Sequence, residues 1–213
     1  MKAYIPQQSE WYRMDNYFVE KVNLTSGQHI VTFSDEESDR PLLFRAGSII
    51  PVVDEHNLPE VINTHNLRQV PIDLWVLPNS NGKAFGDLFF DDGESINTIE
   101  SGEYLYYEFH LNKCRLTFDA VHQPRHSYLA MNSEDILKLS AINVALFETS
   151  NINSDEIKVS LVSENNMTTI GKTDIKIDKN SLKINLEEPL DLLKINLKVE
   201  IDFSYKNNGK CFY

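Results

Sequence analysis

The carboxylates best placed to do chemistry lie together in the segment Asp91-Asp92-Gly93-Glu94. Two carboxyl groups that flank a substrate bond can act as a nucleophile and a general acid. Asp91 and Asp92 are adjacent at the end of a β-prone run, so their side chains should diverge. Asp92-Gly93 also has the chemistry of a turn, in which aspartate oxygens accept from backbone N–H groups and glycine adopts a positive φ. The segment therefore favours a structural turn over a catalytic pair, and we assign no catalytic residue.

Motifs for metals and cofactors give no stronger signal. The segment 91–94 and residues 35–39 superficially resemble calcium loops, but an EF-hand needs oxygen ligands at fixed spacing over about twelve residues. Neither segment has that spacing. The sequence also lacks a phosphate-binding glycine loop and a G-x-S-x-G motif. Zinc spacing is missing among the histidines, which are His29, His56, His65, His110, His122 and His126. We predict no metal site and no cofactor.

The balance of charges argues against two classes of partner. The 213 residues include 20 Lys and Arg against 32 Asp and Glu, which makes the formal net charge −12. Nucleic acids and anionic membranes are both bound through basic faces. No run approaches the ~18 apolar residues of a membrane span, and residues 1–6 lack the apolar stretch of a secretory signal. We expect no nucleic-acid partner and no membrane contact by this chain.

Strands must position these side chains, because the hydrophobic pattern is almost entirely β. Residues 195–203 alternate apolar and polar side chains at every step, as in a strand with one buried face. Asn81-Gly82 and Asp92-Gly93 are hairpin signals on either side of the β-prone Leu88-Phe89-Phe90. Further strands are expected over residues 17–22, 29–33, 72–77, 105–111, 116–118, 137–147, 156–161, 174–178 and 182–186. Many short strands, and no helical stripe, predict an all-β fold built on β-sandwich architecture.

Four blocks of sequence, in this order, resemble a known family. They are Ala3-Tyr4-Ile5-Pro6 with Trp11-Tyr12, residues 41–51 (PLLFRAGSIIP), residues 63–69 (NTHNLRQ) and residues 82–95 (GKAFGDLFFDDGES). Together they resemble the C-terminal β-domains of glycoside hydrolase family 31, the retaining α-glucosidases. The resemblance is nearest to the branch that contains lysosomal acid α-glucosidase, maltase-glucoamylase and sucrase-isomaltase. Ala46 stands where the family commonly has glycine, and Arg13 where it has aspartate.

The resemblance implies an organisation and a role. Residues 1–66 would form a small proximal β-domain and residues 67–213 a larger distal antiparallel β-sandwich; turn residues and weak alternation over residues 57–69 favour the same boundary. The chain would be a non-catalytic region whose partner is an upstream catalytic barrel that acts on α-glucosides. An α-glucoside carbohydrate could be a second partner of this chain. In the family the catalytic aspartates lie in that barrel, and no residue of this chain matches them. The secretory pathway, the lysosome or the extracellular space would be the location.

Two other functions remain open. The chain could be a stand-alone carbohydrate-binding β-sandwich, since such modules stack exposed aromatic rings on sugars. This function needs an exposed platform, for which the tryptophans are Trp11 and Trp75. Trp75 should lie on the strand face opposite Leu74 and Val76. A self-contained hydrolase that uses Asp91 or Asp92 is the least favoured function.

Two residues of the block 41–51 have structural roles by our interpretation. Arg45 lies among apolar residues and cannot lose its charge. If buried, it should pair with a carboxylate or with backbone carbonyls and hold the proximal domain to its neighbour. Gly47 follows where the strand runs into a turn.

Cysteines and sequons add conditional predictions. Cys114 and Cys211 could form a disulfide in an oxidising compartment, or they could be two separate buried thiols. Asn23 and Asn166 lie in N-x-T sequons, which are glycosylation acceptors only in the secretory pathway.

Overall fold

The computed structural model describes residues 2–6, 9–15, 18–22, 30–32, 42–53, 58, 60, 63–113, 115–124, 137–145, 160–162, 167–169, 173–178, 181–192 and 199–202. Strands dominate these residues, so the predicted all-β class is confirmed. The largest sheet contains nine strands, which are β6 (Ser48–Val53), β7 (Ile72–Leu77), β8 (Lys83–Phe90), β9 (Leu105–Asn112), β10 (Arg115–His122), β11 (Lys138–Ala145), β14 (Thr173–Asp178), β15 (Ser181–Asp191) and β16 (Val199–Asp202).

Smaller sheets and short helices complete the described structure. A three-stranded sheet has the order β3-β2-β5, with β2 at Trp11–Asp15, β3 at Phe18–Lys21 and β5 at Leu42–Arg45. Two-stranded sheets pair β1 (Lys2–Tyr4) with β4 (Ile30–Thr32) and β12 (Ser160–Val162) with β13 (Met167–Thr169). The helices are α1 (Thr64–Arg68) and α2 (Thr98–Ser101). None of the described helices is long and apolar enough to cross a membrane.

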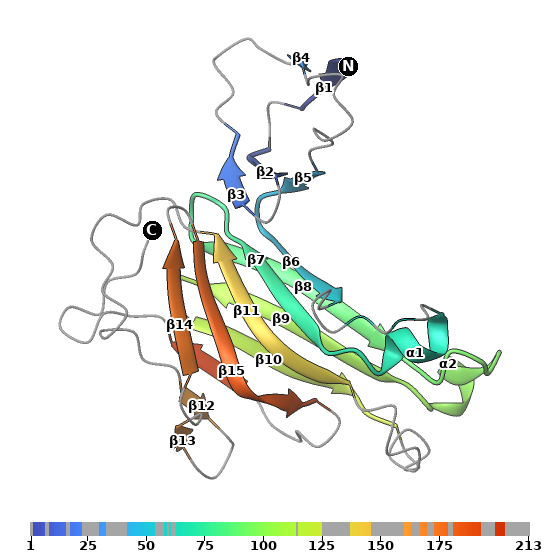
Figure 1. The fold of residues 1–213 in the computed structure, drawn as a ribbon. Coiled ribbons are helices and arrows are strands. Elements are labelled where there is room, and N and C mark those ends of the chain that lie inside the picture. The colour runs from blue at the N-terminus through green and yellow to red at the C-terminus, as the bar shows by residue number, and fades with distance from the viewer. Residues whose placement is uncertain are drawn as a thin grey trace.

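The nine-stranded sheet folds over on itself to make a sandwich (Figure 1). Its order is β14-β15-β11-β7-β6-β8-β9-β10-β16, and the first five strands lie over β8, β9 and β10. The layers are joined where β6 pairs with β8. Ser48 and Phe85 are the one pair of residues in register there. The main core fills the space between the layers, with contributions from Leu74, Ile142, Phe109 and Phe118.

The sequence predicted an antiparallel sandwich, but two pairs of its strands are parallel. β11 pairs with β7 in parallel, and so does β6 with β8. A parallel pair needs a long crossover connection. Between β7 and β11 the chain first builds β8, β9 and β10 of the other layer, and it therefore returns to β7 in the same direction.

Strand β7 is buried on both faces, and all six of its residues are buried. Leu74 and Val76 point into the main core. Trp75 and Leu77 point the other way, into a second cluster with Tyr12. The prediction that Trp75 lies opposite Leu74 and Val76 is thus confirmed, but its indole is buried at 8% exposure.

The second cluster ties the N-terminal strands to the large sheet. The buried Tyr12 hydroxyl donates to the carbonyl oxygen of Pro78 at 2.7 Å, and the Ser80 N–H donates to a Glu10 carboxylate oxygen at 2.7 Å. Strand β6 precedes the predicted boundary at residue 66, yet it belongs to the nine-stranded sheet. The division into domains at 1–66 and 67–213 stays a prediction, and the large sheet begins earlier than that boundary.

Neither helix was predicted, because each is a single turn and too short for a hydrophobic stripe. Asn63 caps α1: its side-chain oxygen accepts from the Asn66 N–H at 2.8 Å. Gly102 ends α2 in the left-handed conformation, with a φ of +73°. Both helices lie at the same end of the sheet, where β8 also ends (Figure 1).

Candidate functional site

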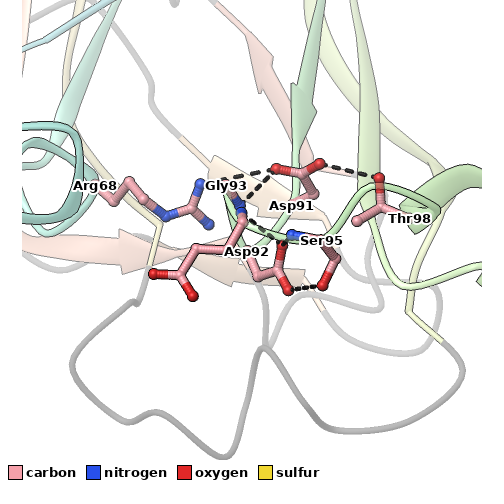
Figure 2. Close-up of polar contacts among 7 residues, drawn as sticks. Arg68, Asp91, Asp92, Gly93, Ser95 and Thr98 are labelled. Carbon is pink, nitrogen blue, oxygen red and sulfur yellow. Dashed lines mark hydrogen bonds and ion pairs between the residues drawn. The ribbon is translucent and has the colours of Figure 1, made fainter.

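The turn that follows β8 is closed by the side chain of Asp92 (Figure 2). Its Oδ1 accepts from the backbone N–H groups of Glu94 at 3.0 Å and Ser95 at 2.9 Å, while the Ser95 hydroxyl donates to its Oδ2. Gly93 sits inside this turn with a φ of +74°. The predicted Asp-Gly turn and the positive φ of Gly93 are therefore confirmed.

Asp91 is held by three neighbours on the other side of the turn (Figure 2). Its Oδ1 accepts from the Gly93 N–H at 2.8 Å, and its Oδ2 accepts from the Thr98 hydroxyl of α2 at 3.0 Å. Arg68, the last residue of α1, places Nη1 at 3.9 Å from Asp91 Oδ1. Asp91 thus connects both short helices to the end of β8.

Arg68 is the residue of this site that the sequence reasoning missed. Its guanidinium lies over the Phe90 ring, with Cζ 4.2 Å from the ring centroid, in cation–π geometry. The side chain is only 15% exposed. Arg68 stands in the block 63–69 that carried the family resemblance, but nothing in its local sequence indicated that it would meet Asp91.

A cavity of about 420 Å³ opens beside this turn. Arg68 lies at its wall together with Asp92 and Glu94 of the turn. The rest of the lining is mainly apolar and comes from Val53, Leu67, Val70, Ile72, Leu88, Phe90 and Leu137, with Thr64 and Gly93 at the remaining positions. The site is therefore an apolar hollow with one cation and two carboxylates at its edge.

The electrostatics of Asp92 does not suit the role of general acid in glycoside hydrolysis. The Ser95 hydroxyl, followed by the Ser95 N–H, holds the pKa of Asp92 below its usual range, and Arg68 adds a smaller effect in the same direction. A general acid needs a raised pKa instead. In addition, both oxygens of Asp91 and both of Asp92 accept hydrogen bonds, three of these oxygens from groups of the turn and Asp91 Oδ2 from Thr98 of α2. These carboxylates stabilise a turn.

Gly47 lies at the crossing between the two layers. With a φ of +86°, it donates its N–H to Leu77 at 2.6 Å and accepts from the Phe85 N–H at 3.0 Å. Next to it, Gly86 approaches Ile49 so closely that an added Cβ would lie 2.0 Å from the Ile49 carbonyl oxygen. Gly47 has a structural role here, as proposed, and Gly86 is a second glycine that the sequence reasoning did not single out.

The expectation of a buried Arg45 is wrong. Arg45 is exposed at the end of β5. Among the residues that the structure describes, β5 is an edge strand of the three-stranded sheet and pairs with β2 alone, so its apolar sequence neighbours do not bury Arg45. Arg45 is therefore no buried fork between two domains.

The tryptophans do not form the exposed platform that a carbohydrate-binding module would need. Trp75 is buried, and its ring centroid lies 6.1 Å from that of Phe44. Trp11 is half-buried, and its indole N–H donates to the carbonyl oxygen of Pro6 at 3.3 Å.

Some sequence predictions lie outside the described residues, namely the pairing of Cys114 with Cys211 and the sequons at Asn23 and Asn166. Within the described part of the chain, no group of three or more His, Cys, Asp or Glu side chains could hold a metal ion.

Comparison with known proteins identifies relatives by sequence. The chain matches no family model. Sucrase-isomaltase of Suncus murinus is 35% identical over 135 residues, which are 63% of this chain and 6% of that protein. The human sucrase-isomaltase is 28% identical over 198 residues, 90% of this chain and 10% of the relative. The chain is a relative of the family 31 α-glucosidases.

The chain spans a tenth or less of the length of those curated relatives. Solved structures show the same fold. The chain matches an ER glucosidase II heterodimeric complex with a TM-score of 0.70 at 18% identity, over 96% of this chain and 21% of that one. It also matches an α-1,4-glucan lyase of Gracilariopsis lemaneiformis with a TM-score of 0.66 at 17% identity, over 94% of this chain and 20% of that one.

Proposed function

We propose that this chain is a non-catalytic C-terminal region of a family 31 glycoside hydrolase and that it supports a catalytic barrel. The observation that carries the proposal is that the best candidates for catalytic carboxylates, Asp91 and Asp92, are engaged in hydrogen bonds. All four oxygens of Asp91 and Asp92 accept hydrogen bonds from the turn or from α2, and the lowered pKa of Asp92 is opposite to that of a general acid.

The relatives support this proposal in two ways. The sequence matches cover only 6% and 10% of the sucrase-isomaltases, so most of each relative lies outside the matched region. The fold also recurs in proteins that are named for different reactions, a glucosidase and a lyase. A region shared by both is better suited to support a catalytic part than to decide which reaction that part performs.

Exposed apolar side chains support the proposal that this chain packs against a partner. Tyr4 is 67% exposed and Leu42 is 55% exposed in the N-terminal sheets, while Ile96 is 97% and Ile99 66% exposed near the turn after β8. Contiguous exposed apolar surface commonly marks an interface, and we propose that these side chains belong to such a surface. The catalytic barrel is the partner that we propose for them.

We assign contact with the α-glucoside to the catalytic part rather than to this chain. Tyr104, which precedes β9, stacks on Phe89 of β8 and on His122 of β10: the centroids of Phe89 and Tyr104 lie 5.1 Å apart, and those of Tyr104 and His122 lie 3.9 Å apart. Of these rings Phe89 is exposed, and Tyr104 and His122 are half-buried. Tyr104 thus uses its ring to stack on protein side chains, which leaves less of it for stacking on a sugar. A stand-alone carbohydrate-binding module is therefore the weaker function.

Two measurements test the proposed function. Residues 1–213 alone should not turn over maltose or an aryl α-glucoside. The native polypeptide that carries them should contain a catalytic barrel, and its activity should survive heating less well when residues 1–213 are removed. Turnover by the isolated chain that disappears in Asp91→Asn or Asp92→Asn would overturn the proposal.

A further inference from the structure

The outer face of the layer formed by β8, β9 and β10 carries three carboxylates in one row. Asp87 of β8 lies opposite Glu108 of β9, and Glu108 lies opposite Asp119 of β10. Residues directly opposite one another share a face of the sheet, with Cβ atoms about 4.5–5.5 Å apart. Asp87 is exposed and the other two are half-buried, whereas Phe109 and Phe118, which precede or follow them by one residue, point into the main core. This carboxylate row therefore faces outward.

The described chain does not neutralise the carboxylate row. Like charges directly opposite one another destabilise a sheet, and among the described residues no lysine or arginine forms an ion pair with any member of the row. Glu108 Oε2 lies 3.3 Å from His110 Nε2, a contact that is an ion pair only when the imidazole is protonated. Desolvation, followed by the charges of Asp87 and Glu108, raises the pKa of Tyr106 on the same face. The row thus imposes a negative field on its surroundings.

Aromatic rings flank the carboxylate row on both sides. Phe85 and His110 are opposite each other on one side, with ring centroids 5.0 Å apart. Phe89 and Tyr106 are opposite each other on the other side. Phe85 is 47% exposed and Phe89 is 42% exposed. The face therefore combines negative charge with exposed aromatic rings.

This combination specifies the chemistry of a partner. A guanidinium group can form paired hydrogen bonds with a carboxylate and can also stack on an aromatic ring. The row crosses three strands, so its ends lie about 10 Å apart. No group of three described His, Cys, Asp or Glu side chains could hold a metal ion. Several separate cations on an extended partner therefore fit the row better than a single ion.

We infer that the outer face of β8, β9 and β10 is a docking surface for a protein segment that bears several arginine side chains. Their guanidinium groups pair with the carboxylate row and stack on Phe85 and Phe89. Complementary charge carries the inference, which goes beyond the proposed function and does not depend on it.

Peptide binding to the full chain tests the inference. The probe is hexaarginine with blocked ends, and isothermal titration calorimetry at low salt measures its affinity. The row variant combines Asp87→Asn, Glu108→Gln and Asp119→Asn, which removes the charges and keeps the side-chain sizes. We expect the row variant to bind at least tenfold more weakly than wild type. No measurable binding of hexaarginine to wild type would overturn the inference.

A matched control separates the row from the general attraction of a chain whose net charge is −12. Asp174→Asn, Glu187→Gln and Glu188→Gln together remove the same charge at exposed positions of β14 and β15, in the other layer. We expect this control to bind hexaarginine within twofold of wild type. If it loses as much affinity as the row variant, net charge alone explains the binding and the inference is wrong.

The exposed rings predict a preference between cations. Hexalysine carries the same charge, but its ammonium groups lack the planar face and the paired donors of a guanidinium. We expect wild type to bind hexaarginine severalfold more tightly than hexalysine, and Phe85→Leu to reduce this ratio. Equal affinities of wild type for the two peptides would contradict an arginine-bearing partner.

The stability of the unbound chain gives a separate measurement. Glu108 stands between two like charges, so Glu108→Gln should raise the urea midpoint or leave it unchanged. Glu187→Gln controls for the loss of one charge at an exposed position. A midpoint of Glu108→Gln below those of wild type and of the control would mean that the row stabilises the chain by itself, and the inference would fail.

Discussion

Gly86 of β8 lies directly against the backbone of Ile49 in β6, where the two layers of the sandwich meet. A Cβ atom at Gly86 would stand 2.0 Å from the Ile49 carbonyl oxygen and 2.8 Å from its carbonyl carbon. These atoms belong to backbone and cannot rotate away. The neighbouring pair Ser48↔Phe85 is the whole register of the β6–β8 contact. Closure of the sandwich therefore depends on the absence of a side chain at Gly86.

Replacing Gly86 with alanine should destabilise the chain. One added methyl group would push β8 away from β6, and overpacking of this kind costs about 1–3 kcal/mol. Urea unfolding of residues 1–213 measures the loss. Lys83→Ala on the same strand is the control, because Lys83 is exposed. Equal unfolding free energies for Gly86→Ala and wild type would show that the layers can separate here without cost.

Gly93 should tolerate asparagine better than valine. A β-branched residue at a φ of +74° strains the backbone by about 1–3 kcal/mol, whereas asparagine visits this region more readily. A Cβ at Gly93 would also lie 3.0 Å from Arg68 Nη1. We expect the unfolding free energy to fall in the order wild type, Gly93→Asn, Gly93→Val. Valine and asparagine variants of equal stability would contradict the role of the positive φ.

Local chemistry made part of this site predictable. Asp92-Gly93 is a turn signal on its own, because the aspartate side chain and the positive φ act within a few residues. The alternation of β15 likewise indicated its buried face, which contains Leu182, Ile184 and Leu186. Such features need only the neighbours along the chain.

Features that depend on distant partners could not be predicted. A glycine in a strand indicates a close approach, but not that Ile49 approaches Gly86. Arg68 became part of the site only because α1 and the end of β8 meet in space. The parallel pairing of β11 with β7 was missed for the same reason, since alternation identifies a strand and not its partner. Arg45 was misplaced because apolar sequence neighbours do not reveal that β5 is an edge strand.

The pKa of the Asp92 carboxyl group should lie below the ordinary value for aspartate. The Ser95 hydroxyl is the largest cause, so Ser95→Ala should move the midpoint upward in an NMR titration. A lowered pKa means that the ionised carboxylate stabilises the fold above the unfolded-state pKa of about 3.9, and that this contribution is lost as the pH falls through the folded-state pKa.

The stability of Asp92→Asn tests the same interaction. We expect this variant to be less stable than wild type at pH 6 and the difference to shrink as the pH falls below about 4. Glu187→Gln, an exposed position on β15, controls for the removal of one negative charge from a chain whose net charge is −12. A difference between Asp92→Asn and wild type that does not change with pH would mean that ionisation of Asp92 does not stabilise the turn.

Tyr107 should make the chain sensitive to alkaline pH. Its side chain is fully buried in the main core, and its hydroxyl donates to the carbonyl oxygen of Leu192 at 2.7 Å. Burial raises the pKa of Tyr107 to about 12. A raised pKa means that the neutral phenol stabilises the fold fully below the unfolded-state pKa of about 10, and that this contribution is lost as the pH rises toward 12.

Tyr107→Phe separates the hydrogen bond from the packing. Since the variant leaves the buried Leu192 carbonyl without its donor, we expect it to lose about 1–3 kcal/mol at pH 8. Between pH 10 and 12 wild type should lose stability faster than the variant, so the two should converge. Urea unfolding at each pH measures the difference, with Tyr4→Phe as the control because Tyr4 is 67% exposed. A constant gap between wild type and Tyr107→Phe across this range would show that Tyr107 has the same pKa in the folded and the unfolded chain, so that burial does not raise it.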